Sequence, residues 1–165
     1  MEHNVIDNFL DTEYFDKLLT LITDTEKTGN TIMPWFFQAG FRGLVETNGY
    51  FYHTFYNDQV PQSPLFNELL PLIHKLELKS LLRVKANLYP NTYKLHEHSM
   101  HEDYYFSHSS AILSLNTCDG YTKLEDGTKI DSVANRMLFF DGSKQHSGTT
   151  TTNEQSRINI NINYI

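Results

Sequence analysis

The stretch Arg157-Ile158-Asn159-Ile160-Asn161-Ile162-Asn163 alternates strictly between polar and apolar side chains. Successive side chains of a β-strand point to opposite faces, so this period of two predicts a strand and not a helix. The three isoleucines are then expected to pack into a core, while Arg157 and the asparagines share the other face. We expect that polar face to line a pocket.

Other short strands are predicted in the second half of the chain. Their patterns are found at Ala111–Leu115, Tyr121–Leu124, Met137–Phe140 and, with the stretch above, Arg157–Tyr164. Asp-Gly pairs at 119–120, 126–127 and 141–142 predict turns between them. Upstream, Leu81–Tyr89 alternates and predicts a strand that ends at Pro90.

The first half predicts two helices after a short opening strand. Asp11 or Thr12 is expected to cap the first helix. Ser63 is a good N-cap for the second, with Pro64 at its first helical position, and Pro71 is expected to kink or split it. Helices followed by many short strands predict an α+β protein that is mainly β, a sandwich or barrel with helices on one face.

Composition limits the class of protein. The chain has 165 residues, which fits one domain. Its net charge of −7 argues against binding long nucleic acid. Its apolar runs are shorter than the ~20 residues that span a bilayer, and no secretory leader is recognisable, so a cytoplasmic protein is expected. The single Cys118 excludes an internal disulfide and a multi-cysteine zinc site.

His101-Glu102-Asp103 places a histidine and an aspartate two residues apart. On a strand their side chains point to the same side, about 6.6 Å apart, and can converge on one metal ion. His146, which follows the strand at 137–140, is the natural third ligand. Two histidines and one carboxylate suit non-haem Fe(II) and leave three positions open, although zinc also accepts this set.

Other readings of the histidines stay open. They can lie on a solvated strand face. His96 and His98 followed by Glu102 match the first half of a cupin-type metal motif. If the strand is continuous, only the even or the odd positions face the pocket. We favour the odd set, which also turns Tyr105 inward, because Thr150 stands where the cupin motif has asparagine. A jelly roll can also be a non-enzymatic binding or structural module, with the candidate ligands scattered.

Two further residues favour a pocket for an acidic cosubstrate. Arg157 comes eleven residues after His146, and the loop at 149–156 can fold its strand back beside that histidine. A guanidinium holds a carboxylate with two parallel hydrogen bonds, so Arg157 suits a dicarboxylate whose other end chelates the metal. Tyr89 can donate its hydroxyl to the same carboxylate.

Taken in order, these residues resemble the 2-oxoglutarate- and Fe(II)-dependent oxygenases, in the prolyl-4-hydroxylase-like branch that includes compact phage and bacterial proteins. The resemblance runs from about Arg83 to Tyr164, and residues 5–22 also look like the start of that family. It rests on an ordered series: Arg83–Pro90, His101-Glu102-Asp103, Leu115-Asn116, Asp119–Thr122, Asn135-Arg136, His146 and Arg157.

The resemblance implies a double-stranded β-helix, which is a distorted jelly roll, in a single domain of residues 1–165. Helical support is expected at about 1–80 and the metal-binding core at about 81–165. The implied catalytic iron ligands are His101, Asp103 and His146. Arg157 and Tyr89 are the implied 2-oxoglutarate-binding residues, and Ser114 falls where relatives often carry another tyrosine.

The resemblance also implies an activity. Fe(II), 2-oxoglutarate and O2 are the expected cofactor and cosubstrates, with ascorbate as an auxiliary reductant. Oxidative decarboxylation of 2-oxoglutarate would be coupled to hydroxylation of peptidyl proline or of a related peptide, protein or small-molecule substrate. We expect a monomer or weak homodimer that binds neither long nucleic acid nor a membrane.

Overall fold

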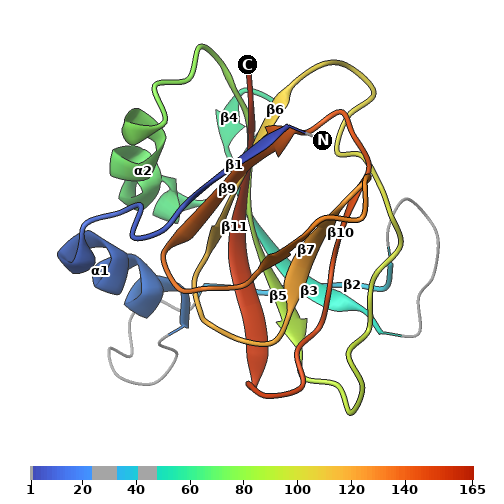
Figure 1. Cartoon of the computed structure of the whole chain (residues 1–165). Coiled ribbons are helices and arrows are strands. Elements are labelled where there is room, and N and C mark those ends of the chain that lie inside the picture. The colour runs from blue at the N-terminus through green and yellow to red at the C-terminus, as the bar shows by residue number, and fades with distance from the viewer. Residues whose placement is uncertain (1, 24–32, 41–47) are drawn as a thin grey trace.

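The computed structural model describes residues 2–23, 33–40 and 48–165, and strands dominate it (Figure 1). The helical elements come from the first half of the chain: α1 (Thr12–Thr23), the short 3-10 helix η1 (Pro64–Leu69) and α2 (Leu70–Lys75). The strands are β1 (His3–Ile6), β2 (Phe36–Gln38), β3 (Tyr50–Asn57), β4 (Val60–Pro61), β5 (Leu81–Pro90), β6 (Ser109–Ser114), β7 (Tyr121–Leu124), β8 (Lys129–Asp131), β9 (Arg136–Asp141), β10 (His146–Gly148) and β11 (Ser156–Tyr164).

The strands form two antiparallel sheets. The large sheet has the order β1-β9-β6-β11-β5-β3-β2, with β4 added beside β3, and the small sheet has the order β10-β7-β8. This arrangement is the double-stranded β-helix, or distorted jelly roll, with helices from the N-terminal half, as the sequence predicted. The large sheet also takes four strands, β1 to β4, from the part of the chain in which helical support was expected.

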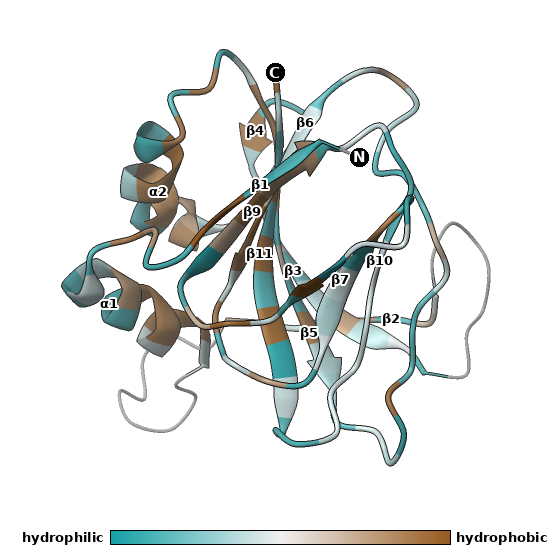
Figure 2. Ribbon diagram, viewed as in Figure 1, coloured by the Kyte–Doolittle hydropathy of each residue, from teal (hydrophilic) through white to brown (hydrophobic). Residues whose placement is uncertain are grey.

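Strand β11 lies between β5 and β6 and separates the core from the pocket. Its isoleucines, Ile158, Ile160 and Ile162, are buried in one cluster with α1 residues such as Leu18 and α2 residues such as Leu72. Burying a side chain of this size stabilises the fold by about 1.5–3 kcal/mol. The helices therefore pack on one side of the large sheet, and β7 and β10 lie on its other side (Figures 1 and 2).

The predicted helix ends are confirmed. The Asp11 carboxylate accepts a hydrogen bond from the backbone N–H of Tyr14 at 2.9 Å, which caps α1. The Ser63 hydroxyl accepts from the N–H of Leu65 at 3.2 Å, and Pro71 lies in the first turn of α2, after the 3-10 segment. Pro71 thus splits the predicted second helix. None of the helices in the described part of the chain is long and apolar enough to cross a membrane.

Candidate metal centre

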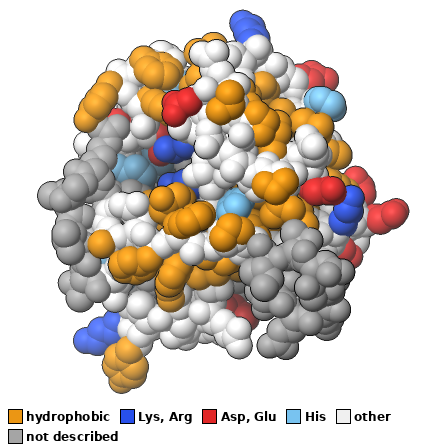
Figure 3. All heavy atoms as spheres, turned by 180° about the vertical axis from the view of Figure 1, so that it is seen from behind, with side chains coloured by type: hydrophobic (Ala, Val, Ile, Leu, Met, Phe, Trp, Pro, Cys, Tyr) orange, Lys and Arg blue, Asp and Glu red, His pale blue; other side chains and the backbone are white. Residues whose placement is uncertain are grey.

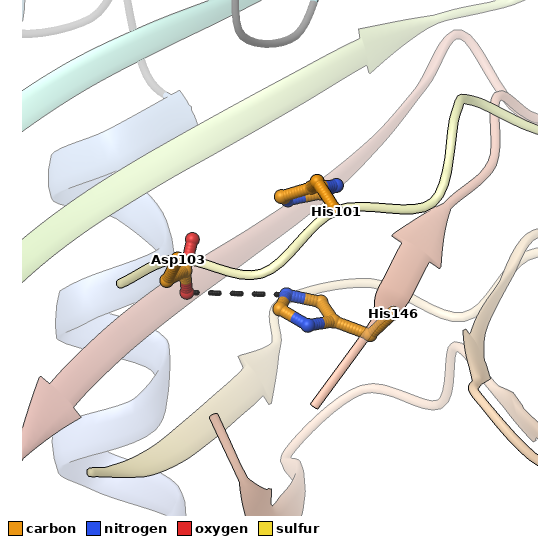
Figure 4. Close-up of side chains that lie close together, drawn as sticks. All are labelled: His101, Asp103 and His146. Carbon is orange, nitrogen blue, oxygen red and sulfur yellow. Dashed lines mark ion pairs between the residues drawn. The ribbon is translucent and has the colours of Figure 1, made fainter. Parts of the chain in front are cut away.

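One group of metal-ligating side chains stands out among the described residues. His101, Asp103 and His146 offer ligand atoms that all lie within 4.8 Å of one another (Figure 4). The structure thereby brings together the three residues that the sequence singled out. His96, His98 and Glu102 do not form such a group in the described part of the chain.

Backbone pairing positions the two histidines. His101 donates its N–H to the carbonyl oxygen of His146 at 2.9 Å, and His146 donates back to His101 at 2.8 Å. This isolated antiparallel bridge holds the two ring centres 4.7 Å apart. His146 begins β10, which pairs with β7 in the small sheet. Two segments that are 45 residues apart in sequence therefore meet at the site.

The structural reason that the sequence suggested for this arrangement was wrong. Residues 101–103 do not form a strand, because only His101 takes part in a bridge and the chain then bends away. The alternation of strand faces does not apply here, and Tyr105, expected to point inward, is 85% exposed. Hydrogen bonds to Asp103, and not strand geometry, bring its carboxylate to the cluster.

The Asp103 carboxylate is almost fully buried and strongly held. Arg83 donates to its Oδ1 at 2.6 Å, while Asn161 and Asn163 donate to its Oδ2 at 3.0 and 2.8 Å. Burial alone would raise the pKa of Asp103, but Arg83, the two imidazoles and Asn163 together lower it well below its usual range. The group is therefore an anion at neutral pH, as a carboxylate that binds a metal must be.

Each histidine is oriented by a backbone carbonyl. Nδ1 of His101 lies 3.2 Å from the oxygen of Ser99, and Nδ1 of His146 lies 3.1 Å from the oxygen of Lys144. A carbonyl only accepts, so Nδ1 carries the proton and Nε2 is the nitrogen that each ring offers to a metal. Burial, with the neighbouring His146, lowers the pKa of His101 to about 4, and burial lowers that of His146. Both rings are thus neutral at pH 7.

Arg157 lies in the same pocket, and its side chain is only 1% exposed. It pairs across strands with Tyr89 and its guanidinium lies over the Tyr89 ring, 5.3 Å from the ring centre. Its Nη2 donates to the hydroxyl of Thr122 at 2.8 Å. No carboxylate of the described residues lies within 4.0 Å of it. A buried cation without an anion is costly, so its surroundings favour an anionic ligand.

The pocket between these groups has polar atoms that the protein does not satisfy. Buried atoms without a hydrogen-bond partner occur in four of its lining side chains: Oδ1 of Asn87, Oγ of Ser147, Nε of Arg157 and Oδ1 of Asn161. Buried polar groups are normally paired, so their gathering in one pocket points to a polar ligand. Glycine at position 148 leaves room for two pocket side chains, because a Cβ there would lie 3.1 Å from Tyr89 and 3.2 Å from Arg157.

Ser114 and several residues that the sequence did not single out lie near the pocket. Ser114 is buried in β6 opposite Asn159 of β11, but it is not among the residues that line the pocket. The alternating pattern of β5 puts Arg83, Lys85 and Asn87 on the face of Tyr89. That signal was sufficient to place Lys85 and Asn87 in the pocket, whereas Arg83 is not among the residues that line it. The contact of Arg83 with Asp103 was not predictable, because the loop at 101–103 has no periodic pattern.

Replacing Arg83 with methionine tests the support of the Asp103 carboxylate. We expect Fe(II) affinity to fall about 10- to 100-fold, as is usual when a partner of a metal ligand is lost. The measurement is an anaerobic Fe(II) titration, with Arg136→Met as the matched control because Arg136 pairs with Asp7 at the surface. Equal Fe(II) affinity in the two variants would show that Arg83 does not support the site.

No protein-family model and no curated protein matches the chain in sequence. In structure it is similar to a Pseudomonas putida prolyl-4-hydroxylase, with a TM-score of 0.66, 16% identity, and 98% of this chain and 91% of that chain covered. An oxidoreductase of the 2OG-Fe(II) oxygenase family from Burkholderia pseudomallei gives a TM-score of 0.69 at 10% identity. The match covers 98% of this chain and 84% of that chain. A prolyl hydroxylase from Trichoplax adhaerens, in complex with a hypoxia inducible factor peptide fragment, gives a TM-score of 0.66 at 17% identity. The match covers 99% of this chain and 83% of that chain.

These likenesses extend over nearly the whole chain at low sequence identity. They establish that the chain has the fold of the 2-oxoglutarate and Fe(II) oxygenases, including the prolyl hydroxylases. Because one fold can host different functions, the activity depends on the residues of the site itself.

Proposed function

We propose that the protein is an Fe(II)- and 2-oxoglutarate-dependent dioxygenase, and that it hydroxylates peptidyl proline or a related substrate. A single observation carries this proposal. One pocket contains both the His101, Asp103 and His146 cluster and the buried Arg157 guanidinium, which has no carboxylate partner among the described residues. The first group suits a metal and the second suits the far end of an acidic cosubstrate.

The donor set fits Fe(II). His101 and His146 would bind through Nε2 and Asp103 through its carboxylate, which are two neutral nitrogens and one anionic oxygen. Together with 2-oxoglutarate and O2, a bound Fe(II) supplies the oxidation that converts a substrate C–H into C–OH, with succinate and CO2 as the other products. One oxygen atom enters the alcohol and the other enters succinate. The protein contributes a fixed ligand geometry and a pocket shielded from water.

Arg157, Thr122 and Tyr89 form the proposed site for the distal carboxylate of 2-oxoglutarate. Arg157 would supply the charge, and Thr122 already holds one end of its guanidinium at 2.8 Å. Tyr89 packs against the guanidinium, with its ring also stacked on Tyr50 at 5.3 Å. Contact of Ser114 with the cosubstrate stays a prediction.

A peptide is the favoured substrate class. The similar prolyl hydroxylase from Trichoplax adhaerens binds a peptide fragment, which supports the same class here. The non-enzymatic alternative requires the candidate ligands to be scattered, and they are instead gathered in one pocket. A monomer or weak homodimer, without long nucleic acid as a partner, stays part of the proposal.

An anaerobic titration with Fe(II) and 2-oxoglutarate tests this function. We expect a weak visible charge-transfer band that saturates only when both are present, and succinate formation once O2 and a prolyl peptide are added. Zn(II) in place of Fe(II) should give neither, because Zn(II) is not redox-active, and this control shows that both signals require iron. A colourless protein that forms no succinate would reject the proposal.

A further inference from the structure

The inner face of the large sheet continues past the metal cluster onto β3 and β2. Residues that pair directly across antiparallel strands point to the same side. Lys85 of β5 pairs with Thr54 of β3, and Tyr52 of β3 pairs with Phe36 of β2, so these side chains share one face. Seen from behind the view of Figure 1, basic side chains and a histidine show together in a hollow among hydrophobic side chains (Figure 3).

A second pocket opens on this face beside the metal pocket. Its lining consists of Gln38, Tyr52, Thr54, Asn57, Arg83 and Lys85. Lys85 lines both pockets, so it lies at the boundary between the metal pocket and this second pocket. A substrate that enters through the second pocket passes the Lys85 side chain before it reaches the metal cluster.

The Lys85 ammonium lies between aromatic rings and has no anionic partner among the described residues. It lies 5.4 and 5.6 Å from the ring centres of Tyr50 and Tyr52, and its Nζ lies 3.5 Å from the Tyr50 hydroxyl. No described carboxylate comes within 4.0 Å of it. Its neighbour Arg83 is different, because it already donates to Asp103 and Asn163.

Burial, followed by the charge of Arg83, lowers the pKa of Lys85 to about 7, and the charge of Asp103 offsets only part of this shift. A cation in this position is destabilised until an anion lies beside it. The Lys85 ammonium can therefore form an ion pair with an anionic ligand, because no carboxylate of the described residues forms one with it.

We propose that Lys85 binds a carboxylate of the substrate. On this proposal the enzyme selects a substrate in which a carboxylate lies close in space to the carbon that is hydroxylated. The proposal rests on the proposed function and adds to it the chemical class of the substrate. A carboxylate fits better than a phosphate, because phosphate sites gather several donors, whereas Arg83 is engaged with Asp103.

The position of Lys85 separates it from the proposed cosubstrate site. Arg157 pairs with Tyr89, and Lys85 precedes Tyr89 by four residues, which is about 13 Å along β5. Lys85 pairs instead with Asn161, whose amide holds Asp103. A 2-oxoglutarate that reaches from the metal cluster to Arg157 therefore extends away from Lys85.

The test uses pairs of probes in which a carboxylate is replaced by an amide. One pair is acetyl-Gly-Pro-Glu-Gly-amide and its Gln counterpart, and the other is L-proline and L-prolinamide. Binding to the wild-type protein is measured by calorimetry under anaerobic conditions, with and without Fe(II) and 2-oxoglutarate. We expect about tenfold or greater preference for the carboxylate in one pair, and that pair identifies a peptide or a free amino acid as the source.

Lys85→Met should abolish this preference, because the affinity for the carboxylate probe should fall to the affinity for the amide probe. Lys85→Arg should restore a preference for the carboxylate probe. Thermal unfolding of both variants checks that they fold. Three results would overturn the inference: preference in neither pair, preference retained in Lys85→Met, or an affinity for 2-oxoglutarate that falls more than twofold in that variant. Absence of the charge-transfer band in the wild type would instead reject the proposed function, since probe binding is measured separately.

Discussion

Replacing Asp103 with alanine is expected to abolish succinate formation and to weaken Fe(II) binding below detection at micromolar protein. The carboxylate is the only anionic member of the proposed ligand set, and two neutral imidazoles alone hold a divalent ion poorly. The readouts are the charge-transfer band in an anaerobic titration and succinate formed after O2 is admitted. A variant that keeps the band and the turnover would show that Asp103 is not a ligand.

The same substitution also carries a stability cost, because Asp103 is the acceptor for Arg83, Asn161 and Asn163. Removing one partner of a buried ion pair costs about 3–5 kcal/mol, since the other charge stays buried. Asp103→Asn keeps the shape and some acceptors, and should lose iron with a smaller loss of thermal stability. Loss of iron binding in the Asn variant, with the fold intact by circular dichroism, separates the ligand role from the structural role.

Glu102→Gln is the matched control for both variants. Glu102 is the neighbour of Asp103 in sequence, but it is not part of the cluster of ligand atoms. It is also the carboxylate that the cupin-type alternative requires together with His96 and His98. Unchanged iron binding in Glu102→Gln would count against that alternative, whereas loss of iron in this variant would favour it.

The fold was largely predictable because its strongest signals are local. The alternation of β11 and the caps at Asp11 and Ser63 depend on backbone geometry within a few residues, and the structure has them as predicted. Strands β2 and β3 were harder to predict, since residues 30–60 are rich in aromatics without a clear period. The place of β3 in the large sheet depends on pairing with β5, which is a long-range contact, and β2 joins the sheet through its pairing with β3.

The metal site was also predictable only where the signal is local. The spacing of His101 and Asp103 indicated a metal site, but the strand proposed to explain it does not exist. The side chains converge because His101 pairs with His146, and because Arg83 reaches Asp103 from β5. Neither contact has a local pattern, so sequence reasoning identified the candidate ligands from their spacing and from a resemblance, but it could not identify the residues that support them.

Arg157→Met is the second substitution with a large expected effect. A charge-assisted hydrogen bond contributes about 1.5–3 kcal/mol, so its loss should weaken 2-oxoglutarate binding about 10- to 100-fold. The readout is the concentration of 2-oxoglutarate that half-saturates the charge-transfer band at fixed Fe(II). Affinity for Fe(II) alone should stay within twofold of wild type, because Arg157 pairs with Tyr89 at the far side of the pocket and is not among the ligand candidates.

The effect on stability gives this prediction a second, independent readout. Asp103 has three donors that would lose their acceptor, whereas Arg157 has no carboxylate partner among the described residues and its Nε is unsatisfied. Replacing a buried cation of this kind with an apolar side chain of similar length is neutral or stabilising, so the apoprotein of Arg157→Met should unfold at the same or a higher temperature. Arg136→Met, which breaks a surface pair with Asp7, should leave 2-oxoglutarate affinity unchanged. A variant that keeps wild-type affinity for 2-oxoglutarate, or that loses stability as Asp103→Ala does, would show that Arg157 serves the fold and not the cosubstrate.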